Sequence, residues 1–360
     1  MVEKNNSHHG TEFFIIAAAI VVVIYGINQA QAVVSLFLLS AFIALIATPP
    51  VLWMERHRVP RSIAVLLVIS ALIILLLIMG VIVGTSLSSF SDALPFYQQR
   101  LREEVLALKP FLASKHIMVT DKVLLEYFNP GPILGLAVGA LSQMGAALSN
   151  VLLILLTVVF ILLEASSFPE KIRSVLGDPQ RVFPQFTKFA NEMKRYMIIK
   201  TVINLSAGMI IAVWLIILSV DFPVLWGFMT FLLLFIPNIG SVIAAIPAVL
   251  LALTQHGGET ALLAALGYFA VGTILGNILE PKIMGRKLGM STLVVFLSMI
   301  FWGTMLGPVG VVLCIPLTMT VKAAFESNDR TAWIGVLLGP EIAHTEKIAA
   351  EKKQTVALRV

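Results

Sequence analysis

Charge is what this sequence has least of. Of its 360 residues, 12% are charged and 58% are hydrophobic, whereas soluble domains carry about 25% charged and about 45–50% apolar residues. Half the usual charge leaves too little polar surface to cover a globule in water, so the excess apolar surface must face lipid. The scarcity of charge therefore excludes a soluble domain and predicts an integral membrane protein.

Cysteine is almost absent, and the common catalytic motifs are missing. The single cysteine, Cys314, cannot form an intrachain disulfide, so the sequence carries no sign of an oxidising compartment. The sequence has no G-x-x-x-x-G-K-[ST] loop for nucleotide phosphates and no His/Cys cluster with the spacing of metal ligands. It also lacks an arguable Ser-His-Asp arrangement. We therefore expect no enzyme, no cofactor and no metal site.

Long uncharged stretches predict the membrane segments, because a helix needs about 20 apolar residues to cross a hydrocarbon core of roughly 30 Å. Residues 13–54 predict two spans with a tight turn near Asn28–Gln31. Further stretches without charge are residues 62–91, 132–163, 201–220, 222–258, 260–279 and 288–321. Residues 92–126 instead have apolar residues at helical spacing with charges on the other faces, which predicts a small amphipathic helical subdomain outside the membrane.

The distribution of Lys and Arg predicts the orientation, since basic loops stay on the cytoplasmic side. Lys282, Arg286 and Lys287 should be cytoplasmic, which requires residues 222–258 to enter and leave the membrane on the outer face. As one helix this segment would measure about 55 Å, too long for one untilted span. Divided at Pro237–Gly240, it gives two pieces of about 20 Å, each too short to cross.

The same comparison of helix length with membrane thickness applies to residues 288–321. They are interrupted by Gly303, Gly307, Pro308 and Gly310. We therefore predict two re-entrant hairpins of opposite orientation. The fold class is all-α, with about eight membrane segments (six full spans and two Pro/Gly-broken re-entrant hairpins) and a small external helical subdomain. The protein is expected to be multi-pass in the bacterial inner membrane, with cytoplasmic N- and C-termini.

These boundaries divide the chain into six parts. They are residues 1–91 with spans 1–3, 92–131 as the external amphipathic subdomain, 132–164 as a long helix leading into span 4, 165–200 as a cytoplasmic basic connection, 201–327 as the transport core with both hairpins, and 328–360 as a cytoplasmic tail.

The first hairpin carries the first candidate site. Pro237 removes a backbone donor and Gly240 permits a turn. The half-helix that begins near Ser241 would present unsatisfied amides and a positive dipole to anionic or hydroxyl-rich groups. A simple proline kink with Asn238 as a helix cap is the structural alternative.

A second candidate group lies in and after residues 260–279. Asn277 is inside this span and Glu280 is at its cytoplasmic end, and polar groups at such depth normally face a cavity or a partner. Glu280 could pair with Lys282 or Arg286, or take up protons. Asn204 has a similar but weaker claim, because an interhelical hydrogen bond worth about 1 kcal/mol would also explain it.

The predicted substrate pathway is therefore formed by Asn204, Pro237, Asn238, Gly240, Ser241, Asn277, Glu280 and Arg286. No ionisable residue lies in the middle of a span, which weakens a proton-relay mechanism. Glu164 and Glu280, both near cytoplasmic ends, are the candidates for proton or ion coupling.

Several stretches resemble the autoinducer-2 exporter family. They are PNIGSVIAAIP (residues 237–247), GNILEPKIMGRKLGMSTLVVFLSMIFWG (276–303), GPVGVVLCIPLT (307–318), RVPRSIAV (58–65) and LLTVVFILLE (155–164). The resemblance implies export of a small polyhydroxylated quorum-sensing signal without ATP hydrolysis, by a homo-oligomer. The family also includes members assigned as sodium/proton antiporters.

Three functions remain open at this point. The preferred one is export of a small polar signalling metabolite, with autoinducer-2 as the first candidate. The alternatives are a monovalent cation (sodium)/proton antiporter that uses Glu280 or Glu164, and a non-transporting membrane scaffold that recruits partners through residues 92–126 or 166–199. The expected partners are a small-molecule solute, the lipid bilayer and further copies of the chain, and no nucleic acid.

Overall fold

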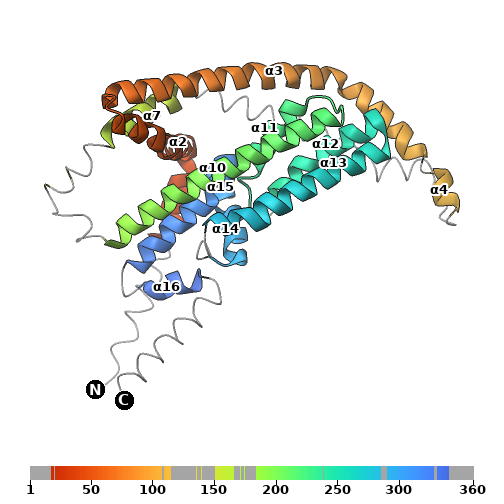
Figure 1. Cartoon of the computed structure of the whole chain (residues 1–360). Helices are drawn as coiled ribbons and strands as arrows, with labels where there is room; N and C mark the ends of the chain where they lie inside the picture. Colours follow the sequence, from red (N-terminus) through yellow and green to blue (C-terminus); the bar gives the residue numbers. More distant parts are fainter. Residues whose placement is uncertain are drawn as a thin grey trace, which may run out of the picture. The chain divides into compact units, whose positions relative to one another are not determined.

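The computed structural model describes a chain built of helices. The described residues are 18–19, 21–107, 109–114, 151–165, 184–237, 239–284, 290–327 and 331–339, with single positions 135, 139, 171 and 174. The helices are α2 (Gln31–Arg56), α3 (Arg61–Ala107), α4 (Lys109–Ser114), α7 (Val151–Glu164), α10 (Pro184–Ile217), α11 (Pro223–Leu233), α12 (Gly240–His256), α13 (Gly258–Val271), the π-helix η1 (Gly272–Leu279), α14 (Glu280–Met284), α15 (Thr292–Glu326) and α16 (Ala332–Leu337). Within these residues no strand occurs, which confirms the all-α class (Figure 1).

Five of the described helices are long and apolar enough to cross a membrane. They lie in residues 31–56, 61–103, 190–217, 258–284 and 292–326, and three shorter apolar helices, α7, α11 and α12, accompany them. The length and the apolar composition of these helices support a multi-pass membrane protein. The chain separates into two compact units, residues 44–288 and residues 1–43 with 289–360.

The chain does not reverse at the turn predicted near Asn28–Gln31; the structure has a single turn residue, Ala30, between helical residues 21–29 and α2. The backbone amide of Ala30 donates to Gly26 O at 3.0 Å, and that of Val34 donates to Ala30 O at 3.0 Å. These are helical i→i−4 bonds, so the chain continues through the expected turn. Two of the polar residues that suggested a turn are accommodated because their side chains find partners: Gln29 Nε2 donates to Tyr25 Oη at 3.0 Å, and Asn28 Nδ2 donates to Thr304 O at 3.4 Å.

Two helices continue past the points where charge begins. The helix α3 runs on through Asp92 to Ala107, and α10 begins at Pro184 and includes Lys200. Lys, Arg and Glu are good helix formers, so the appearance of charge does not end a helix. With 47 residues, α3 is about 70 Å long, more than twice the thickness of the hydrocarbon core. The external position of residues 92–131 stays a prediction, and the structure describes them only as far as Ser114.

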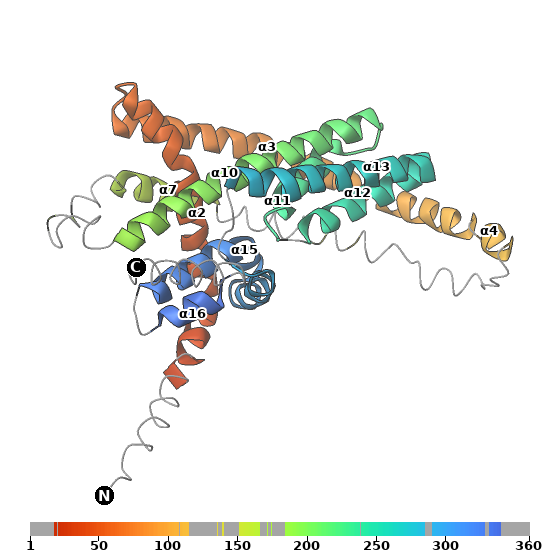
Figure 2. The same cartoon turned by 60° about the horizontal axis from the view of Figure 1, so that its bottom comes forward.

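Residues 223–256 form a helical hairpin, as the broken-segment prediction requires. The arms α11 and α12 have 11 and 17 residues, so they measure about 16 and 25 Å. The two ends of the segment meet, since Asp221 N donates to Gln255 Oε1 at 3.1 Å and His256 Nε2 lies 3.0 Å from Ser219 O. The segment therefore enters and leaves at the same end of its unit (Figures 1 and 2).

Residues 292–326 form a second hairpin within α15. The backbone at Gly307 is non-helical, with φ 64° and ψ −148°. Trp302 Nε1 donates to Thr318 Oγ1 at 3.0 Å, although sixteen positions would be about 24 Å apart along a straight helix. The two arms therefore fold back on each other at Gly307. The following helix α16 closes the base of this hairpin, because Ser291 N donates to Leu338 O at 3.2 Å.

The core of the larger unit lies where α3, α10, α11, α12 and α13 pack together. Trp226 is fully buried there, and the ring of Phe90 meets it edge-on at 5.3 Å between centroids. The backbones of α10 and α11 approach closely at Gly208 and Gly227, since a Cβ on Gly208 would lie 2.5 Å from Gly227 O. This close packing fixes the first hairpin against α10 and so positions the site described next.

Candidate functional site

A buried ion pair lies at one end of the larger unit. Lys200 Nζ of α10 is 3.0 and 2.9 Å from the two carboxylate oxygens of Glu280, the first residue of α14. The side chains are only 10% and 15% exposed. Removing one partner of such a pair leaves an uncompensated buried charge, which is strongly destabilising. The two helices also meet where Arg195 donates to Ile283 O at 3.2 Å.

The structure changes the expected pairing of Glu280. Its partner is Lys200, eighty positions away in the sequence, and the neighbouring Lys282 is exposed. Local proximity along the chain suggested Lys282 or Arg286, but on a helix such close neighbours point in different directions. Arg286 lies outside the described residues. Lys200 was missed because it stands at the edge of a basic stretch that suggested a solvated connection.

Asn204 connects this ion pair to the tip of the first hairpin. It follows Lys200 by one helical turn on α10 and is 1% exposed. In the amide orientation that satisfies both of its polar groups, Nδ2 donates to Lys200 O at 3.3 Å and Oδ1 accepts from Phe235 N at 3.2 Å. Phe235 belongs to the turn between α11 and α12, so Asn204 holds non-helical backbone against α10.

The tip itself is tightly closed. A Cβ on Gly240 would lie 1.9 Å from Leu233 O, so only glycine fits where α12 begins. Pro237 lies in the turn, where its carbonyl accepts from Ile239 N at 2.7 Å. Ser241 faces the start of η1, the helix that leads to Glu280, since a Cβ on Gly272 would be 3.4 Å from Ser241 Cβ and 3.6 Å from its Oγ. Asn238 lies outside the described residues.

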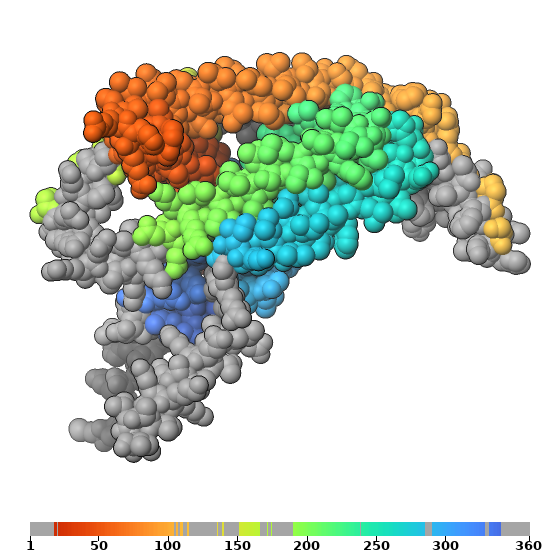
Figure 3. Space-filling model, viewed as in Figure 1, coloured from red at the N-terminus to blue at the C-terminus, as the bar shows by residue number. Residues whose placement is uncertain are grey.

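The helix that faces this tip is a π-helix, which the sequence did not predict. Residues 272–279 form η1, and the amide of Glu280 donates to Leu275 O, five positions earlier. π-helical segments are rare and occur frequently at functional sites. Asn277 lies within η1, is exposed, and makes no hydrogen bond to any described residue. Figure 3 shows α10 running alongside α13, η1 and α14, in green beside cyan and blue.

One further polar atom near the ion pair lacks a partner. Thr201, the residue after Lys200, has a buried hydroxyl oxygen with no hydrogen bond to the part of the chain that the structure describes. Most buried polar atoms in proteins are paired. A water molecule or a solute hydroxyl would satisfy this group.

Glu164 does not belong to this site. It ends α7, and its carboxylate is bonded to Lys171 Nζ, with both side chains more than half exposed. An exposed pair of this kind contributes little to stability or to selective binding.

A polar cluster that the sequence did not predict lies at the other end of α10. Asp221 Oδ2 accepts from Tyr97 Oη at 2.8 Å and from Gln255 Nε2 at 2.5 Å. Trp226 Nε1 donates to Asp221 O at 3.1 Å. The cluster ties α3, the α10–α11 connection and α12 together. It was missed because its members are each isolated polar residues in the sequence.

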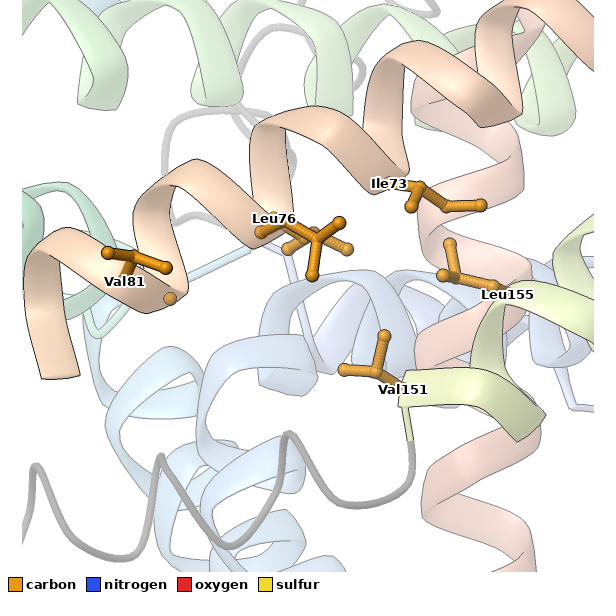
Figure 4. A pocket seen from close by; sticks show the side chains of 7 residues that line it. Ile73, Leu76, Val81, Val151 and Leu155 are labelled. Atoms are coloured by element: carbon orange, nitrogen blue, oxygen red, sulfur yellow. The ribbon is translucent and has the colours of Figure 1, made fainter.

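Two hollows lined by described residues lie apart from the residues of the site. One of about 310 Å³ lies between α3 and α7, where Ile73, Leu76, Val81, Val151 and Leu155 line it (Figure 4). Another of about 660 Å³ lies between α10 and α13 around Trp214 and Gly267. Both are lined by apolar side chains, so neither can recognise a polar solute by hydrogen bonds.

The polar groups at the first hairpin tip suit an uncharged, hydroxyl-rich ligand. Amides and hydroxyls both donate and accept hydrogen bonds, and the Lys200–Glu280 pair carries no net charge. In the ranges described, no group of His, Cys, Asp and Glu could hold a metal ion.

Comparison with known proteins finds relatives among bacterial transport proteins. Residues 13–329 match the model of the AI-2E family transporter. The chain is 39% identical over 316 residues to the AI-2 transport protein TqsA of Escherichia coli strain K12, covering 88% of this chain and 92% of that protein. It is 32% identical to "Putative transport protein YhhT" of the same strain over 88% of this chain and 91% of that one. A transport protein of Haemophilus influenzae, also named without a substrate, is 34% identical over 88% of this chain and 93% of its own length.

Proposed function

Because the chain belongs to the AI-2E family of transporters, we propose that it exports a small polar signalling metabolite across the bacterial inner membrane without ATP hydrolysis. Autoinducer-2 is the candidate substrate, since that is the solute in the name of the relative TqsA. The observation that carries the proposal is the polar site at the first hairpin tip, where Asn204 joins the buried Lys200–Glu280 pair to non-helical backbone.

The proposed pathway uses the side chains that can exchange hydrogen bonds with hydroxyl groups. They are Asn204, Ser241, Asn277 and Glu280, with Pro237 and Gly240 shaping the tip. The exposed amide of Asn277 and the unpartnered hydroxyl of Thr201 support this role, because both need a partner at membrane depth. Asn238 and Arg286 remain part of the proposal on sequence grounds.

The proposed topology keeps the two re-entrant hairpins but has five full spans, because residues 13–54 do not turn back at Asn28–Gln31. The arms of the first hairpin, about 16 and 25 Å long, are shorter than the roughly 30 Å core, and their ends meet. Glu280 would lie at the cytoplasmic end, and the second hairpin returns the chain to the side from which it started. This places the C-terminus in the cytoplasm and residues 92–131 outside. With five full spans the N-terminus then lies on the outer side, unlike the sequence prediction.

A sodium/proton antiporter is the second candidate. The buried Lys200–Glu280 pair supports it, because ionisable residues inside membrane proteins often mark ion or proton pathways. In this alternative Glu280 would carry the coupled ion, and Glu280→Gln would abolish sodium-dependent proton movement. Glu164 is less suited to this role, since its side chain is 56% exposed.

Uptake of autoinducer-2 into liposomes that contain the purified protein tests the proposal. We expect uptake that follows the gradient of the solute and does not need a sodium or pH gradient. Asn277→Ala should slow uptake at least about ten-fold, since a binding amide is worth about 1.4 kcal/mol or more. Ile278→Ala, an exposed apolar neighbour on η1, is the matched control and should transport at the parental rate.

Three results would overturn this assignment. Sodium-dependent proton movement without uptake of the solute would favour the antiporter. Equal uptake by Asn277→Ala and the parental protein would remove the proposed pathway residue, and absence of any transport would leave the scaffold hypothesis.

A further inference from the structure

The second hairpin exposes backbone groups at its tip. Gly307 breaks the helix with φ 64° and ψ −148°, and the last four carbonyls before a helix end have no partner inside that helix. Pro308 begins the second arm and has no backbone N–H to donate. In hydrocarbon, each unsatisfied backbone group costs several kcal/mol. The tip therefore needs donors from elsewhere in its unit.

A stripe of polar side chains near the N-terminus supplies these donors. Asn28 Nδ2 donates to Thr304 O at 3.4 Å, and Ser35 Oγ donates to Leu306 O at 3.2 Å. Gln31 lies between them, and its Nε2 would be 2.8 Å from a Cβ placed on Gly307. Positions 28, 31 and 35 share one helical face, and this face meets the hairpin tip.

Several donor and acceptor groups of these side chains have no hydrogen-bond partner among the described residues. Asn28 uses one of its two N–H donors in the bond to Thr304 O, and its Oδ1 has no partner among the described residues. The amide of Gln31 likewise forms no hydrogen bond within the described ranges. Asn28 is exposed, and Gln31 and Ser35 are partly exposed. These groups can therefore accept or donate further bonds without rearrangement of the hairpin.

The depth of the tip in the membrane makes these unpaired donor and acceptor groups significant. The first arm, residues 292–306, is about 22 Å long, which keeps the tip inside a hydrocarbon core of roughly 30 Å. Polar groups exposed at that depth normally face a water-filled path or a partner. The stretch 13–54 holds no charged residue, so the amides are not explained by ion pairing.

We propose that Asn28, Gln31 and Ser35, together with the carbonyl groups at the Gly307 tip, form a second solute-binding site. It is separate from the site at the first hairpin and takes an uncharged, hydroxyl-rich molecule. The negative end of the first arm and the positive end of the second meet at Gly307, so their dipoles offset each other and favour neither an anion nor a cation. The proposal rests on the proposed transport function for the choice of solute.

Cysteine accessibility tests this site without depending on transport. The single native cysteine, Cys314, is fully buried, so the parental protein gives the background of labelling by a water-soluble maleimide. We expect Gln31→Cys and Ser35→Cys to be labelled in membranes. At ten times its dissociation constant, autoinducer-2 should slow that labelling about ten-fold, because roughly a tenth of the sites stay empty. Val33→Cys, 72% exposed on another face of the helix, is the control and should not be labelled because lipid covers it.

A transport assay provides the second measurement. Gln31→Leu should reduce uptake of autoinducer-2 about ten-fold or more, whereas Gln29→Leu should not, because the Gln29 amide donates to Tyr25 within its own helix. Protection from labelling in a protein that does not transport would support the site and refute the proposed function. Normal transport with no labelling, or with labelling that the solute does not slow, would refute the site. Protection by sodium chloride, but not by choline chloride or the solute, would assign the tip to a cation and overturn the proposal.

Discussion

Removing the charge of Lys200 should destabilise the protein more than any exposed charge substitution. Lys200→Met keeps the length of the side chain but leaves the Glu280 carboxylate, 15% exposed, without its partner. Breaking a buried pair from one side costs about 3–5 kcal/mol. Since 1.36 kcal/mol is a factor of ten, the ratio of folded to unfolded protein should fall by about 2–4 orders of magnitude.

A double variant separates the pair from its individual charges. Lys200→Met with Glu280→Leu removes both charges and fills the space with apolar atoms, a replacement that is often neutral or stabilising for buried pairs. The double variant should therefore regain most of the stability that the single variant loses. Lys171→Met breaks the exposed pair with Glu164 and should cost less than about 1 kcal/mol.

The free energy of unfolding can be measured by urea titration of the purified protein in detergent, followed by tryptophan fluorescence. Trp226, which is fully buried in the same unit, reports the transition. The reasoning is refuted if Lys200→Met loses no more stability than Lys171→Met. It is also refuted if the double variant is as unstable as Lys200→Met, since the two charges would then not be coupled.

Two further substitutions test the packing around the first hairpin. Gly240→Ala should lower the free energy of unfolding by about 1–3 kcal/mol, because the added Cβ would lie 1.9 Å from Leu233 O. Gly276→Ala is the control and should cost little, because nothing lies within 4 Å of its added Cβ. Equal urea midpoints for the two variants would contradict the close packing at the tip. Tyr97→Phe removes the 2.8 Å bond to Asp221 and should cost about 1–2 kcal/mol. It should also speed amide exchange in the α10–α11 connection, and unchanged exchange there would show that the cluster does not hold the helices together.

The hairpins could be predicted from the sequence because they follow from length and charge. Basic residues near Arg286 had to lie on one side of the membrane, and that condition allowed residues 222–258 only an even number of crossings. The hairpin turn before Gly240 satisfies this condition for residues 222–258. The reversal at Gly307 gives residues 288–321 the same hairpin form. The same reasoning gives a wrong result for residues 13–54, whose length predicts two spans although the chain does not reverse near Asn28. Composition cannot distinguish a loop from a helix whose amides bind a neighbouring backbone.

The ion pair and the π-helix could not be predicted for a different reason. Lys200 and Glu280 are brought together by the packing of α10 against α14, which depends on contacts far apart in the sequence. The π-helix at Gly272–Leu279 changes the hydrogen-bond register without a distinctive residue type, since Asn277 and its apolar neighbours would also fit a regular helix. The residues of the candidate site were thus identified in part, but their partners were not.

The two hairpin tips share a physical requirement that the sequence does record. Non-helical backbone inside a membrane must find donors and acceptors in neighbouring helices, and each tip here finds them in an amide on an apolar helix. Asn204 accepts from Phe235 N at the first tip, and Asn28 donates to Thr304 O at the second. An isolated Asn or Gln in an otherwise apolar stretch, in a chain that also has Pro/Gly-broken segments, therefore predicts which helix holds a tip. Both polar groups of Asn204 are bonded to backbone, so a solute beside it would compete for bonds that stabilise the fold. Asn28 uses only one donor in its backbone bond, so it can hold its tip and bind a solute at the same time.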